Sequence, residues 1–123
     1  EIDMLLTNGD AVIAVEVKTT LKVSDVKEHI EKRLSPLKRF FPEYQDKKVY
    51  GAVAYIHKEE DADRHAYQKG LFVLTFTTGD FVTIQNDVNF TPTCWGGEVL
   101  RTTGVVLRKY LKIPICTYAQ TLI

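Results

Sequence analysis

Two carboxylates and a lysine stand near the start of the chain in a pattern that suits metal-assisted phosphodiester chemistry. Asp3 precedes an apolar run, and Glu16 and Lys18 flank the single residue Val17. Hard divalent cations such as Mg²⁺ take oxygen ligands, usually one or two carboxylates together with water and phosphate oxygens. Such an ion polarises a phosphate and supplies hydroxide near neutral pH, while a neighbouring lysine orients or deprotonates the attacking water. The trio therefore indicates a metal-dependent hydrolase, with the Val17 backbone carbonyl as a third oxygen ligand.

A β-hairpin over residues 1–18 would bring these side chains together. The pair Asn8-Gly9 lies between two apolar, β-branched runs, which is the strongest short-range signal for a two-residue type I′ turn. With that turn Asp3 lies opposite Ala14, and the alternation of side chains along a strand places the trio on one face. Asp3 and Glu16 are then diagonal neighbours, roughly 7–8 Å apart at the backbone, and a divalent cation can bridge them.

The surroundings of the trio allow a second interpretation. Both sides of the predicted ribbon are apolar apart from its charged end, which predicts a ribbon buried on both faces. Burying two neighbouring carboxylates costs several kcal/mol unless a cation pairs with them. In the plainer interpretation, Glu16 and Lys18 are an ordinary charged pair near a fraying strand end.

An Asp, a hairpin of this length and the sequence Glu-Val-Lys resemble the PD-(D/E)XK nuclease superfamily, which has the restriction-endonuclease-like fold. Four later segments are similar to one uncharacterised prokaryotic group in that superfamily: Phe41-Pro42, Val49 to Ile56, Lys69 to Asp80 and Asn86 to Trp95. The resemblance covers residues 1–95. It implies an α/β domain with a mixed β-sheet that is opened by a β-hairpin and flanked by helices.

The resemblance also implies an activity. Asp3 and Glu16 would bind Mg²⁺, or Mn²⁺ in its place, and Lys18 would activate water in an endonuclease that acts on DNA. Two departures accompany it: Ile2 stands where the name of the superfamily places proline, and the helix that usually precedes the Asp is not in the sequence. We therefore expect the N-terminal helix of the fold to lie outside this chain.

Composition and charge limit the partners. The chain has 123 residues, of which 45% are hydrophobic and 26% charged, as is usual for one globular domain. No apolar run approaches the roughly 20 residues of a membrane span, so we expect a cytoplasmic protein without a membrane partner. The formal net charge of zero disfavours a generally basic nucleic-acid binder. Residues 18–48, however, carry nine Lys and Arg against five Asp and Glu. This local excess either contacts DNA phosphates near the site or is a solvated helix face.

The remaining pattern predicts alternating helices and strands. We expect helices over residues 24–41 and 58–70, a buried strand over 49–56 that pairs in parallel with the hairpin, and strands over 71–77 and 81–86.

In the first of these helices Ser24 is the predicted N-cap, and Pro36 either kinks the helix or begins a new turn that Ser35 caps. Gly51 in the buried strand predicts close packing. The inward stripe is Val26, Ile30, Leu34 and Leu37, and the water-facing side is Lys27, Glu28, Glu31, Lys32 and Arg33. His29 is interpreted as a boundary residue and not as a metal ligand or base.

Residues 96–123 form an apolar tail of unclear structure. The pattern after Gly96-Gly97 fits neither a helical nor a strand period, and the tail either packs on the domain of residues 1–95 or forms a homodimer contact. Cys94 and Cys116 lack the spacing of a zinc site; a disulfide between them stays open, and free thiols are the preferred interpretation. Two functions stay open: a metal-dependent DNA nuclease, and a catalytically silent module with the nuclease fold that binds nucleic acid or protein.

Overall fold

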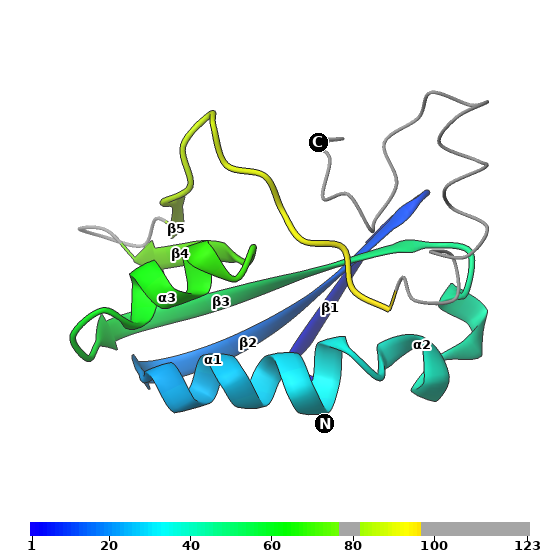
Figure 1. Cartoon of the computed structure of the whole chain (residues 1–123), viewed down its shortest axis with the longest axis horizontal. Coiled ribbons are helices and arrows are strands. Elements are labelled where there is room, and N and C mark those ends of the chain that lie inside the picture. Colours follow the sequence, from blue (N-terminus) through cyan, green and yellow to red (C-terminus); the bar gives the residue numbers. More distant parts are fainter. Residues whose placement is uncertain (77–81, 97–123) are drawn as a thin grey trace.

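A computed structural model describes residues 1–76 and 82–96 of the chain. In this part five strands form one mixed sheet in the order β1-β2-β3-β4-β5, and helices accompany it (Figure 1). The strands are β1 (Met4–Asn8), β2 (Ala11–Leu21), β3 (Lys48–Lys58), β4 (Phe72–Phe76) and β5 (Val82–Ile84). The helical elements are α1 (Val23–His29), the π-helix η1 (Ile30–Leu34), α2 (Leu37–Phe40), the 3-10 helix η2 (Pro42–Tyr44) and α3 (Ala62–Gln68). The expected α/β class with a mixed sheet is confirmed.

The sheet begins and ends with antiparallel pairs and is parallel in its middle. β1 and β2 form an antiparallel hairpin, β2 pairs in parallel with β3, β3 in parallel with β4, and β4 antiparallel with β5. The predicted parallel pairing of the third strand with the second is confirmed. Parallel neighbours need a crossover, and α1, η1 and α2 supply it between β2 and β3, while α3 supplies it between β3 and β4.

The hairpin turn differs from the predicted one. Asn8 belongs to β1 and pairs with Ala11, so the two turn residues are Gly9 and Asp10. Gly9 has φ of +46°, and Asp10 is not among the non-glycine residues with positive φ. A type I′ turn at Asn8-Gly9 would need positive φ at both central residues, whereas a turn that starts with glycine needs it only at the first. The register is therefore shifted by two residues, and Leu5, not Asp3, lies opposite Ala14.

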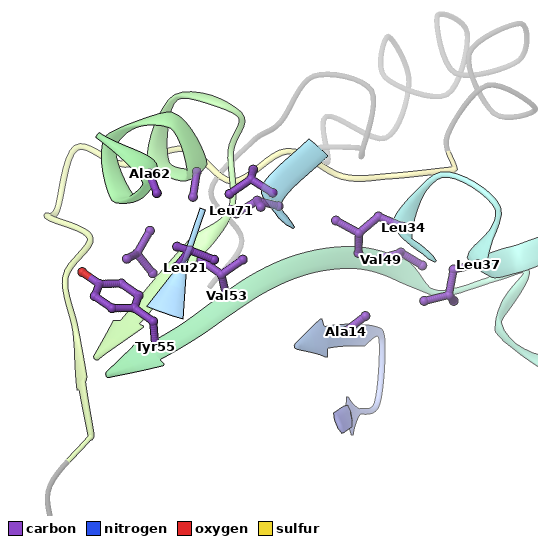
Figure 2. Packing of buried hydrophobic residues seen from close by; sticks show 12 residues of the cluster. Ala14, Leu21, Leu34, Leu37, Val49, Val53, Tyr55, Ala62 and Leu71 are labelled. Atoms are coloured by element: carbon purple, nitrogen blue, oxygen red, sulfur yellow. The ribbon is translucent and has the colours of Figure 1, made fainter. Parts of the chain in front are cut away.

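The main core lies between one face of the sheet and the helices. Figure 2 shows the buried side chains of this cluster, to which β2 and β3 contribute Ala14, Leu21, Val49 and Val53 and the helical segments Leu34, Leu37 and Ala62. Gly51 lies at its centre. A Cβ atom there would come within 2.7 Å of Leu71 and closer still to Leu34, so the predicted close packing is confirmed.

The first crossover is not one regular helix. The predicted helix over residues 24–41 is divided into α1, η1 and α2, with Pro36 at the N-cap of α2 because proline has no N–H to donate in a helix interior. The prediction of Ser24 as N-cap is wrong, since Lys22 holds that position. Asp25, in the first turn, accepts a hydrogen bond from the Lys22 backbone N–H at 2.9 Å.

The other face of the sheet carries an exposed apolar surface within the part of the chain that the structure describes. We call it the open face, and its exposed side chains are Met4, Leu6, Val17, Ile56, Phe76, Val82 and Ile84. The strand registers place all of them on the same side. The prediction that the hairpin is buried on both faces is therefore wrong for Met4, Leu6 and Val17.

Two predictions concern residues that the structure does not cover. The tail from Gly97 onward and the end of the Lys69 to Asp80 segment lie outside the described residues. Cys94, by contrast, is described. It takes part in a disulfide and packs beside Tyr50, so its interpretation as a free thiol is wrong.

Candidate functional site

The hairpin brings Asp3 and Glu16 to directly opposed positions. Extending the β1–β2 register by one residue beyond the pair Met4–Val15 sets Asp3 opposite Glu16. The Val17 backbone N–H donates a hydrogen bond of 2.9 Å to Asp3 Oδ2, which ties the start of the chain to β2. The two-residue shift of the turn preserves the predicted face, because side chains alternate with period two. It also makes the acids direct neighbours instead of diagonal ones.

Glu16 is buried although its side chain is charged in water. The residue is only 4% exposed, and its Oε1 atom has no hydrogen-bond partner among the described residues. Burial raises the pKa of the Glu16 carboxyl, and the negative charge of Asp3 raises it further, while Arg33 and Lys18 act in the opposite direction. The fold thus holds a carboxylate in a place where its ionised form is disfavoured, which is common at functional sites.

Two cationic side chains flank Glu16, one on each oxygen. Lys18 Nζ lies 3.5 Å from Glu16 Oε2 and 3.7 Å from Asp25 Oδ1. Arg33 Nε lies 3.6 Å from Glu16 Oε1 and donates a hydrogen bond of 2.6 Å to the backbone carbonyl of Glu1. Sequence reasoning placed Lys18 beside Glu16 correctly, but it did not include Asp25 or Arg33.

The position of Arg33 corrects the predicted face of the first helix. Arg33 does not face water, because its side chain is only 18% exposed and points to Glu16. The signal was present in the sequence: Arg33 follows Val26 by seven residues and His29 by four, spacings that return to the same side of a helix. Arg33 also lies in the π-helix η1, and such π-bulges occur frequently at functional sites.

His29 lies beneath the site and not at the boundary of the core. It is fully buried, and Nε2 donates a hydrogen bond of 3.1 Å to the Ala14 carbonyl if the ring carries its proton there. Its Nδ1 atom has no hydrogen-bond partner among the residues described. Burial lowers the pKa of His29 to about 4, with Arg33 acting in the same direction. The ring is therefore neutral at pH 7 and fastens α1 to β2.

The site offers a hard divalent cation two carboxylates, which is close to the smallest number of protein ligands that such an ion uses. Residues 1–76 and 82–96 contain no group of three or more His, Cys, Asp and Glu side chains placed to hold a metal ion. Mg²⁺, however, is commonly bound through one or two carboxylates, with water and phosphate oxygens completing its shell. Asp3 and Glu16 supply that number, and the buried Oε1 atom of Glu16, which has the Arg33 ion pair but no hydrogen bond, is an acceptor that a cation would satisfy.

Fold and site together define an α/β protein with a mixed sheet and a buried acid pair beside its first hairpin. A scan against protein-family models, a search of curated proteins and a search of solved structures found no match to this chain. Among the described helices none has the length and apolar character needed to cross a membrane.

Proposed function

We propose that the chain belongs to a metal-dependent nuclease of the PD-(D/E)XK superfamily, with a restriction-endonuclease-like fold, that hydrolyses phosphodiester bonds of DNA. One observation carries the proposal. Two opposed carboxylates, Asp3 and a buried Glu16 whose Oε1 atom lacks a hydrogen bond, share one side of a hairpin with the Lys18 ammonium group. The resemblance of the sequence to that superfamily points to the same three residues.

The residues would divide the work as follows. Asp3, Glu16 and the Val17 carbonyl hold Mg²⁺ or Mn²⁺, which when bound polarises the phosphate and lowers the pKa of a bound water. Lys18 is part-exposed, so its amine reaches both the acid pair and solvent. An ammonium has three donors and no acceptor, so Lys18 orients the attacking water and neutralises charge that develops on the phosphate.

Glu16 would change its partners when a cation binds. Arg33 and Lys18 offset the negative charge of Glu16, and neither makes a hydrogen bond to Oε1. If Asp3 and Glu16 hold a divalent cation, the Glu16 carboxylate would be stabilised in its ionised form and would depend less on Arg33 for charge compensation. Arg33 then becomes available to a phosphate oxygen of the substrate, for which its guanidinium is well suited.

A second function is favoured by the open face. Seven large apolar side chains on one side of the sheet are typical of a surface that another protein segment covers. In this alternative the chain is a catalytically silent module with the nuclease fold, and the acid pair is a remnant that contributes to binding or stability.

A nicking assay on supercoiled plasmid with Mg²⁺ or Mn²⁺ distinguishes the nuclease from the silent module. We expect the parent protein to nick, and Asp3→Asn, Glu16→Gln and Lys18→Ala each to lose at least about 100-fold of the rate, the loss usual when a group that acts in the transition state is removed. The matched control is Asp10→Asn, which removes an exposed carboxylate in the hairpin turn and should leave nicking unchanged. A parent protein that fails to nick, or variants that nick like the parent, would reject the nuclease and favour the silent module.

A further inference from the structure

A cavity of about 270 Å³ opens next to the acid pair, and nothing in the proposed chemistry uses it. Its lining residues are Glu1, Ile2, Lys32, Arg33, Phe40 and Phe41. Arg33 belongs to both places, because the same side chain lines the cavity and approaches Glu16 Oε1 at 3.6 Å. Figure 1 shows the N-terminus beside the end of the first helical segment, where Arg33 donates a hydrogen bond to the Glu1 backbone carbonyl. The cavity is therefore adjacent to the position that a scissile phosphate would occupy.

The cavity wall contains an aromatic ring that packs poorly on the protein. Phe40 is 65% exposed. The other large apolar side chains that are exposed in the described residues lie outside the helices. Its neighbour Phe41 is part-buried and packs against Tyr44 in a tilted arrangement with ring centroids 6.0 Å apart, a contact within the protein that Phe40 lacks. An exposed aromatic ring is a platform on which a nucleic-acid base can stack, since every base has a π-face.

The charges of the cavity suit a phosphodiester strand. Lys32 is 70% exposed, and its only ion pair among the described residues is with the exposed Glu28 at 3.6 Å. Arg33 points the other way along the cavity, toward the acid pair. One cation at the rim and one at the boundary with the site give two anchoring points for phosphates, and the exposed Phe40 ring in the same cavity wall is available to a base.

We propose that this cavity is a nucleotide-binding subsite in which Phe40 stacks on the base next to the scissile phosphate while Lys32 and Arg33 contact the backbone. The inference rests on the proposed nuclease function and adds the class of substrate. A base inside a duplex is already stacked on both faces, so only an unpaired base can enter the cavity. The preferred substrate is single-stranded DNA or a locally unpaired stretch of duplex.

Binding can test this without any cleavage. We would measure fluorescence anisotropy of a labelled single-stranded oligothymidine in EDTA, so that no divalent ion contributes. Phe40→Ala should weaken the binding about 5- to 100-fold, the range expected for loss of one base–aromatic stack, whereas Phe40→Trp should keep it. The matched control is Val88→Ala, which trims another exposed apolar side chain, 96% exposed, that lines a different cavity. It should leave the affinity unchanged.

A backbone oligomer of the same length without bases isolates the stacking contact. The parent should bind it more weakly than oligothymidine, while Phe40→Ala should bind both about equally. Lys32→Gln should leave that base preference intact and reduce the slope of log affinity against log salt by about 0.7, the value for one phosphate contact on a single strand. Equal binding of both oligomers by the parent, an unchanged affinity in Phe40→Ala, or an equal loss for duplex DNA would overturn the proposal.

The outcomes separate this subsite from the nuclease itself. A parent protein that prefers bases through Phe40 but does not nick plasmid would support the subsite and reject the nuclease. A parent that nicks without any base preference would reject the subsite and leave the nuclease intact.

Discussion

Acidification should destabilise this protein through one buried side chain, His29. The ring is fully buried, and its Nδ1 atom has no partner among the described residues. Protonation would place a charge next to Arg33 with no acceptor for the new N–H, although Asp3 offers a weaker opposing attraction. The folded protein therefore resists protonation of His29, while the unfolded chain does not.

The direction and the size of the change in unfolding free energy follow from the pKa of His29 in the unfolded and folded states. Folding lowers the pKa of His29 from 6.5 to about 4, so between these pH values the unfolded state binds more protons. The stability due to the neutral ring is complete above pH 6.5 and is lost as the pH falls toward 4. At about 1.36 kcal/mol per pKa unit, the loss between pH 7.5 and pH 4.5 amounts to about 2.5 kcal/mol. For a small domain that is a large share of the total free energy of unfolding.

The measurement is urea denaturation at pH 7.5 and pH 4.5, followed by far-UV circular dichroism, for the parent and for His29→Gln. Glutamine keeps an amide donor for the Ala14 carbonyl but does not titrate, so its own cost should be the same at both pH values. The carboxylates, including Glu16, contribute equally to both proteins and cancel in the comparison. We expect the parent to lose about 2.5 kcal/mol more than His29→Gln on acidification.

Parallel pH dependence of the two proteins would refute this reasoning. It would mean that the Nδ1 atom of the imidazole is solvated or paired in the folded state, so that protonation costs little there.

Three further predictions concern the core, a loop and the acid pair. Gly51→Ala should destabilise the fold by about 1–3 kcal/mol, because its new methyl group would overlap Leu34, and an unchanged thermal midpoint would contradict the close packing. Asn86→Ala should cost about 1–3 kcal/mol in urea denaturation, since its side chain satisfies two backbone groups of the strand region, whereas exposed Gln85→Ala should cost under about 0.5 kcal/mol. Millimolar Mn²⁺ should raise the thermal midpoint of the parent but not of Asp3→Asn, and equal shifts would exclude Asp3 as a ligand.

Much of the architecture is legible in the sequence because it depends on local periodicity. The apolar runs around Gly9 predicted a hairpin, and the run from Val49 to Ile56 predicted a buried strand, both of which the structure contains. Alternation with period two also predicted that Asp3, Glu16 and Lys18 lie on one face. This prediction holds although the turn was placed wrongly, because the register differs from the predicted one by two residues, an even number.

Tertiary structure decided the features that depend on contacts between distant segments. The ladder to Ala11 placed Asn8 in a strand, although Asn-Gly is locally a good turn, so the register was settled by pairing and not by the turn sequence. Arg33 entered the site because η1 packs on the sheet through Leu34, and the neighbouring Arg33 side chain then reaches Glu16. A list of charged residues could not foresee this contact between η1 and Glu16.

The acid pair also combines features that follow from the sequence with features that depend on tertiary packing. The sequence by itself determined which residue types stand at the site and on which side of the ribbon they lie, since both follow from spacing along one chain segment. Only the packed structure decided that Glu16 is buried, that its Oε1 atom lacks a hydrogen bond, and that a cavity opens beside it. Burial and cavities depend on what every other segment covers, and that is a property of the assembled layers and not of any stretch of sequence.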